Sequence, residues 1–209
     1  MKIVKLFLAG MLALFLAACN NTEALERFAT DIDKSVKAES QLQDIGPELQ
    51  KLESEKVEVF NTLEKTTPEK FRAAADKLLK NTEERSKLIE QEIKAMEHSQ
   101  EIYESSKSKT KDIEDEQQKK TVMEFIKVND NKFKKHNDLM NSYKEILKAE
   151  KEVFTHMKEP QPDMKNINKK IEVVTKKYET FHKDTNSYAN LLKVVNNHKE
   201  KITDILNGK

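Results

Sequence analysis

The chain is poor in the residues that close tight turns and cross-link small folds. Its 209 residues include three glycines, four prolines and a single cysteine. One cysteine cannot form an intramolecular disulfide, and so few glycines argue against a phosphate-binding loop or a Gly-x-Ser-x-Gly nucleophile elbow. Because turn-forming residues are scarce, little room is left for hairpins and strands. The sequence therefore predicts a helical protein without a recognisable catalytic motif.

The charges are numerous but balanced. Charged residues make up 36% of the chain, and the formal net charge is +1. Loss of residues 1–18 would remove Lys2 and Lys5 and leave a net charge of −1. Binding a polyanion such as DNA or RNA requires a clear basic excess, so we expect no nucleic acid partner.

The first eighteen residues have the order of a bacterial export signal. Lys2 and Lys5 give a positive start, and an uncharged, mostly apolar run extends from Leu6 to Ala18. A stable membrane span needs about 20 apolar residues, so this run is better explained as the core of a signal peptide. It ends in a lipobox, an aliphatic residue and two small residues before a cysteine: Leu16, Ala17, Ala18 and Cys19.

The lipobox predicts how the chain is processed and where it is held. We expect cleavage directly before Cys19, with residues 1–18 as the signal peptide and residues 19–21 as a lipidated tether. A diacylglyceryl group on the Cys19 sulfur would anchor the chain at the outer face of the cytoplasmic membrane. Residues 22–209 would then form the exported domain.

Apolar residues in the exported domain recur at alternating steps of three and four, as one buried face of a helix requires. The clearest seam runs from Ile167 to Leu206, where ten of twelve successive seam positions are apolar or aromatic. A second seam runs from Val122 to Met157, and weaker ones run from Leu25 to Leu63 and from Phe71 to Tyr103. The sequence thus predicts four long helices.

Several residues indicate where these helices begin and break. Thr67 before Pro68, and Asp163 after Pro162, are suitable N-caps. Gly46-Pro47 should kink the first helix, because proline removes a backbone donor and crowds the preceding turn. The turn between the second and third helices is expected within residues 108–119, where charges crowd and apolar residues are sparse. The alternative there is one uninterrupted helix of ~90 residues.

Four segments of similar length favour an all-α, antiparallel up-down-up-down bundle, a coiled-coil rod ~60–65 Å long at ~1.5 Å per residue. Residues 22–65 carry a net charge of −5 and residues 163–209 a net charge of +4. Opposite signs favour ion pairing between the flanks of the first and last helices. The alternative is that each of the two helices exposes its charged face to solvent, and that the two faces merely happen to differ in net charge.

Few side chains suggest chemistry. Glu179 and His182 form one Glu-x-x-His pair, whereas di-iron bundles need two such pairs and two more glutamates. We therefore expect no metal, no cofactor and no catalytic residues. His136, Asn129 and Glu150 fall on the seam from Val122 to Met157, where they are best explained as a polar layer that fixes helix register. The four tyrosines fit seam positions and are expected to pack in the core: Tyr103, Tyr143, Tyr178 and Tyr188.

The lipobox followed by four lysine- and glutamate-rich helices resembles the YkyA-type family of cell-wall-binding lipoproteins of Gram-positive bacteria. The likeness is carried by Leu16-Ala17-Ala18-Cys19, by the stretch from Leu52 to Asn61 before Thr67-Pro68, and by residues 113–116 and 143–145. This resemblance implies a non-enzymatic binding or spacer module between membrane and wall, whose partner is a wall polymer or an envelope protein.

Two further hypotheses concern the partner. If it is an anionic polymer, the closely spaced lysines of the last helix are the expected contact: Lys169, Lys170, Lys176, Lys177 and Lys183. The alternative is that these lysines only keep the rod soluble. If the partner is instead another envelope protein complex, the chain would be a helical adaptor, and exposed apolar residues should cluster on one face: Val57, Leu79, Val173 and Val194.

Overall fold

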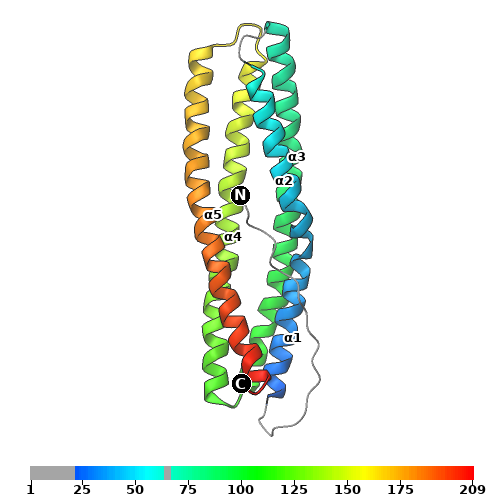
Figure 1. Cartoon of the computed structure of the whole chain (residues 1–209), viewed down its shortest axis with the longest axis vertical. Helices are drawn as coiled ribbons and strands as arrows, with labels where there is room; N and C mark the ends of the chain where they lie inside the picture. Colours follow the sequence, from blue (N-terminus) through cyan, green and yellow to red (C-terminus); the bar gives the residue numbers. More distant parts are fainter. Residues whose placement is uncertain (1–21, 64–66) are drawn as a thin grey trace.

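The computed structural model describes residues 22–63 and 67–209 and shows an elongated bundle of helices (Figure 1). The predicted signal peptide, lipobox and tether lie outside the described residues. The helices follow in the order α1 (Glu23–Ala38), α2 (Leu42–Asn61), α3 (Pro68–Lys107), α4 (Glu116–Met157) and α5 (Met164–Leu206). Because α1 and α2 together form one arm of the rod, the bundle has four antiparallel arms, and the predicted all-α fold is confirmed.

The predicted helix starts are present. The Thr67 side chain accepts a hydrogen bond from the Lys70 amide at 3.4 Å at the start of α3. The Asp163 carboxylate accepts from the amides of Lys165 and Asn166 at 3.0 and 3.2 Å, which caps α5. In both cases a side-chain oxygen satisfies amides that have no partner within the helix.

The turn between α3 and α4 lies within the predicted residues 108–119. It consists of a 3-10 helix, η2 (Ser108–Asp112), followed by three residues before Glu116. Ile113 in this turn is 1% exposed and belongs to the apolar cluster at this end of the rod. Ile113 thus packs the turn against the end of the bundle, and the alternative of one helix of ~90 residues is wrong.

The first arm is interrupted, as predicted, but the irregular turn lies shortly before the proline. A 3-10 turn, η1 (Glu39–Gln41), separates α1 from α2, and Pro47 lies inside α2. The Glu39 carboxylate accepts hydrogen bonds from the Ser99 hydroxyl at 2.7 Å and from the Lys132 ammonium at 2.5 Å. These contacts with α3 and α4 hold the turn in place.

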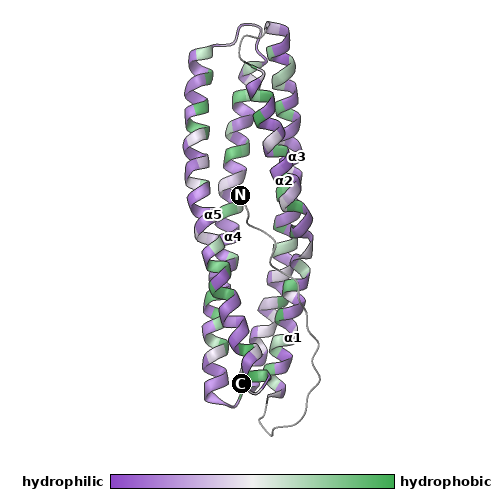
Figure 2. Ribbon diagram, in the orientation of Figure 1, coloured by the Kyte–Doolittle hydropathy of each residue, from purple (hydrophilic) through white to green (hydrophobic). Residues whose placement is uncertain are grey.

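The core consists of apolar clusters along the rod, and each helix alternates hydrophobic and hydrophilic residues (Figure 2). At the end where α1 begins, Phe28 and Phe125 meet edge to face with their ring centroids 6.0 Å apart. At the opposite end, Leu78, Phe154 and Ile167 pack together. Truncation of such buried rings typically costs ~3–5 kcal/mol. In the part of the chain that the structure describes, no helix combines the length and the apolar character needed to span a membrane.

Candidate functional site

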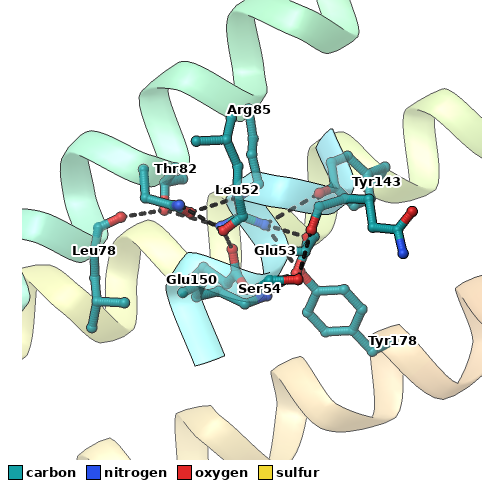
Figure 3. A network of polar contacts seen from close by, with 12 residues as sticks. Leu52, Glu53, Ser54, Leu78, Thr82, Arg85, Tyr143, Glu150 and Tyr178 are labelled. Carbon is teal, nitrogen blue, oxygen red and sulfur yellow. Dashed lines mark hydrogen bonds and ion pairs between the residues drawn. The ribbon is translucent and has the colours of Figure 1, made fainter. Parts of the chain in front are cut away.

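Four charged side chains meet inside the bundle, and we call them the charged layer: Glu53 and Lys56 of α2, Arg85 of α3 and Glu150 of α4. Figure 3 shows three of them, Glu53, Arg85 and Glu150. Arg85 Nη1 lies 2.7 Å from Glu53 Oε1, and its Nη2 contacts Glu150 Oε2. Lys56 Nζ lies 2.5 Å from Glu53 Oε2 and 2.8 Å from Glu150 Oε1. Two cations face two carboxylates, so the layer has no net charge.

Tyr178 brings α5 into the charged layer. Its hydroxyl lies 2.9 Å from Glu53 Oε1 and 3.0 Å from Glu150 Oε1, and it accepts a hydrogen bond from Lys56 Nζ at 2.7 Å. Burial, together with the carboxylates of Glu150 and Glu53, raises the pKa of this hydroxyl. A neutral Tyr178 that can donate to a carboxylate is thus the stable form, and all four arms of the bundle share one polar network.

Further polar groups fix the orientation of Arg85. Asn81 accepts from Arg85 Nε at 2.9 Å and donates its own amide to the Leu52 carbonyl at 2.7 Å. The Tyr143 hydroxyl contacts both Glu53 and Arg85. Burial alone would lower the pKa of Arg85, but the neighbouring Glu150 raises it, so the guanidinium stays charged.

The charged layer is a packed structural element rather than an open site. The side chain of Arg85 is 0% exposed and that of Glu150 is 3% exposed. Burying charges is costly, and this cost is offset only when each charge has well-placed partners. Arg85 satisfies this requirement through contacts to α2, α3, α4 and α5, which a helix shifted by one turn could not make. The layer therefore fixes the register of the four arms.

The five lysines predicted as a contact lie on α5 in two rows. Lys170 Nζ is 3.0 Å from Glu152, and Lys177 Nζ is 3.8 Å from Glu145, so this inner row pairs with α4. The second, outward row is exposed and repeats every seven residues: Lys169, Lys176 and Lys183. Residues seven apart lie on nearly the same face of a helix. The structure thus separates three accessible lysines from two that are held along α4.

The expected pairing between the first and last helices is present at one point. Lys199 Nζ of α5 lies 2.7 Å from Asp33 of α1. The inner-row lysines, however, face glutamates of α4 instead of the acidic first arm. The helix in contact with this side of α5 is α4. Acidic residues of α4 therefore neutralise the lysines that the net charges alone had assigned to the first helix.

The predicted polar residues of the seam from Val122 to Met157 are all buried, but they lie at different levels of the rod. His136 Nε2 is 3.0 Å from the Glu92 carboxylate, and the His136 ring lies 5.9 Å from the Tyr188 ring. Asn129 lies beside the Tyr103 hydroxyl. Glu150 belongs to the charged layer. They form separate polar contacts rather than one layer.

The lone Glu-x-x-His pair, Glu179 and His182, lies on the exposed side of α5. Among residues 22–63 and 67–209, no group of three or more histidine, cysteine, aspartate or glutamate side chains is arranged to hold a metal ion. Cys19 and the lipobox lie outside the described residues, so their role stays a prediction.

Sequence analysis missed the charged layer, although the sequence contains a signal for it. Lys56, Arg85 and Glu150 each occupy a seam position where the pattern calls for an apolar residue. A buried cation on two seams and a buried anion on a third indicate a polar contact between those helices. The tyrosine rings pack in the core, as expected. The sequence did not predict the polar contacts that their hydroxyl groups make.

These features define a class of protein: a rod of four antiparallel helical arms in which apolar clusters alternate with buried polar contacts. The chain belongs to the YkyA family, described as "Putative cell-wall binding lipoprotein", which matches residues 23–205. Membership of a lipoprotein family implies a membrane-anchored position in the envelope.

The fold is similar to that of a solved structure. That structure is the 1.6 Å crystal structure of a conserved protein of unknown function from Staphylococcus aureus, with a TM-score of 0.68 and 19% sequence identity. The match covers 85% of this chain and 91% of that one. At this identity the likeness supports the fold alone. No curated protein matches the chain.

Proposed function

We propose that this chain is a non-catalytic rod, anchored by diacylglyceryl-Cys19 at the outer face of the cytoplasmic membrane, that contacts an anionic polymer of the cell wall. The observation that carries the proposal is the outward lysine row of Lys169, Lys176 and Lys183, which projects from α5 away from the core. Its support is the membership of the YkyA family, whose description names cell-wall binding.

The position of the row along the rod favours the wall over the membrane as its partner. The anchor would lie just before Thr22, at the end of the rod where α1 begins, and α5 begins at the opposite end (Figure 1). At ~1.5 Å per residue, the 42 residues of α4 span ~63 Å. If the rod stands upright, the lysine row lies in the half far from the lipid, well beyond the Debye length of ~8 Å.

The adaptor alternative predicted an apolar face formed by four residues, and these four do not form one. Val57 lies on α2, while Val173 and Val194 lie on α5, with 53%, 51% and 42% of each residue exposed. Val173 and Val194 are ~32 Å apart along the helix at ~1.5 Å per residue. Leu79 packs against the core cluster at the far end. Scattered exposed apolar residues are usual on a soluble surface, so they favour no docking site.

The test is co-sedimentation of the mature chain with purified wall fragments at low and raised salt. Changing Lys169, Lys176 and Lys183 to glutamine should weaken binding several-fold, and binding of the unchanged chain should fall as salt rises. A matched control is available on α3, where Lys80, Lys87 and Lys94 are exposed and have the same spacing. Their change to glutamine alters the net charge equally but leaves α5 intact.

Two outcomes would contradict the proposal. Equal losses in the two triple variants would show that only net charge matters, and binding that is insensitive to salt would point to an apolar or protein-mediated contact. If the mature chain bound solubilised envelope proteins and not wall fragments, the adaptor alternative would be favoured.

A further inference from the structure

The helix α5 is buried far less deeply than the other long helices. Of its 43 residues only Ile167 and Ile202, near its two ends, are buried, whereas α4 buries 17 of 42. The apolar seam residues between them are half-buried, among them Phe181 and Tyr188. Local opening is easiest where few apolar contacts must be broken. We therefore expect α5 to separate from the rod at a lower free-energy cost than α3 or α4.

The contacts that α5 does make are specific in position. Tyr178 fits the charged layer, and Lys170 and Lys177 face Glu152 and Glu145 one heptad apart on α4. A helix that replaced α5 would have to carry a hydroxyl and two lysines at these same levels. The α5 of a second copy of this chain meets that requirement in full.

The connection between α4 and α5 is suited to an exchange. It consists of residues 158–163 and contains Pro160 and Pro162. Residues 158–161 form a turn followed by bends. Proline disfavours helical conformation in the residue before it, so the connection does not continue α4 as a helix. Once extended for the exchange, six residues reach ~20 Å at ~3.3 Å each, about the width of two packed helices. The connection lies at the end of the rod where α5 begins, so two copies anchored by their other ends could stand parallel and cross there.

From this geometry we propose that two copies of the chain exchange α5, each α5 packing against the α4 of its partner. The exchanged pair keeps every contact of Tyr178, Lys170 and Lys177 and changes only the connection, so its stability relative to two single rods is set by concentration. Anchoring in one membrane raises the effective concentration of the second copy. The exchange does not depend on the contact with the wall proposed above.

A cross-linking experiment tests this directly. Two forms of the full-length chain are produced in the same cells, one carrying Glu152→Cys and the other Lys170→Cys, each with a different tag. A short thiol-specific cross-linker is then added to the membranes. A covalent heterodimer is expected, because the two positions meet between chains only after exchange. A single chain that carries both substitutions should also cross-link within itself, which would confirm that the side chains at positions 152 and 170 lie close together.

The matched control replaces Lys170→Cys by Lys169→Cys, which lies next to it but on the outward row. Non-specific collisions would give both pairs of variants the same yield of heterodimer. If exchange occurs, the pair with Lys170→Cys should give at least about fivefold more heterodimer than the pair with Lys169→Cys. The chain without added cysteines gives the background from Cys19. Equal yields for the two pairs, or heterodimer at the background level, would refute the exchange.

Hydrogen exchange of the mature chain in detergent gives an independent readout. Amides in the middle of α5 should exchange roughly tenfold faster than those of α4 at the same level, as expected for a unit of low local stability. Tyr178→Phe should speed the formation of heterodimers without changing their final amount, since single and exchanged rods lose the same contacts. Equal protection of α4 and α5, or an unchanged rate in Tyr178→Phe, would contradict the proposal.

Discussion

Arg85 of α3 and Glu150 of α4 contact each other through guanidinium and carboxylate in the interior of the bundle, with 0% and 3% of their side chains exposed. The pair is supported from both sides, since Glu53 also contacts Arg85 and Lys56 also contacts Glu150. Buried ion pairs of this kind often contribute little net stability, but removal of one partner leaves a costly unpaired charge. The contribution of this pair can be measured.

We predict that Arg85→Met lowers the free energy of unfolding by about 3 kcal/mol, because it removes one of the two cations that contact the buried Glu150 carboxylate. The double variant Arg85→Met with Glu150→Leu should be less destabilised than the single one, since Glu53 and Lys56 still pair at 2.5 Å. Urea unfolding followed by far-UV circular dichroism gives both values. If the double variant unfolded at lower urea than Arg85→Met, the pair would be net stabilising and this account wrong.

The charged layer should also make stability depend on pH. Burial alone would raise the pKa of Glu53, but Arg85 and Lys56 lower it from 4.5 to about 2. Because the pKa is lower in the folded state, the stability that Glu53 contributes is fully present above pH 4.5 and is lost as the pH falls toward 2. The loss should be on the order of 2 kcal/mol.

This dependence is measured by urea unfolding at a series of acidic pH values. Glu53→Gln should flatten the decline in stability between pH 4.5 and 2. Glu55→Gln is a suitable control, since the Glu55 side chain is 47% exposed and its nearest cation, Lys51, is 3.7 Å away. A decline that is equally steep in Glu53→Gln and in the unchanged chain would place its origin in other carboxylates.

Lipid attachment is expected to depend on Cys19. Two acyl chains give stable membrane binding where one gives only marginal binding, at ~0.8 kcal/mol per buried methylene. Cys19→Ser should therefore release the protein to the medium or leave it as unprocessed precursor. Fractionation of cells followed by immunoblotting distinguishes these products. Processed, membrane-bound protein in the normal amount would show that the lipobox is not the anchor.

Wall binding, if it occurs, should depend neither on a metal ion nor on His182. The reason is that Glu179 and His182 form a lone pair, and no third ligand is arranged with them among the described residues. Sedimentation with wall fragments should be unchanged by a chelator and by His182→Ala. Loss of binding in either case, with the helical circular dichroism signal intact, would require a metal or histidine contact.

Much of the architecture could be predicted from the sequence because it depends on local spacing. The seam from Ile167 to Leu206 predicted α5, and Thr67 and Asp163 marked helix starts that the structure confirms. These predictions need only the period of the helix and the chemistry of an N-cap, both of which act within a few residues. The signal peptide and the lipobox are likewise local patterns, and their role stays a prediction.

The tertiary structure decided which charges meet. Arg85 and Glu150 are 65 residues apart in the chain, and no local rule joins them. From the net charges of the segments, the lysines of the last helix were expected to pair with the acidic first arm. Lys170 and Lys177 pair with α4 instead. Ion pairing requires contact within a few ångströms, and α4 is the helix in contact with these lysines. The shallow burial of α5 also depends on how the four arms pack. Helical period thus determined the elements of this protein, and packing across the bundle determined its charged layer, its accessible lysines and its least buried arm.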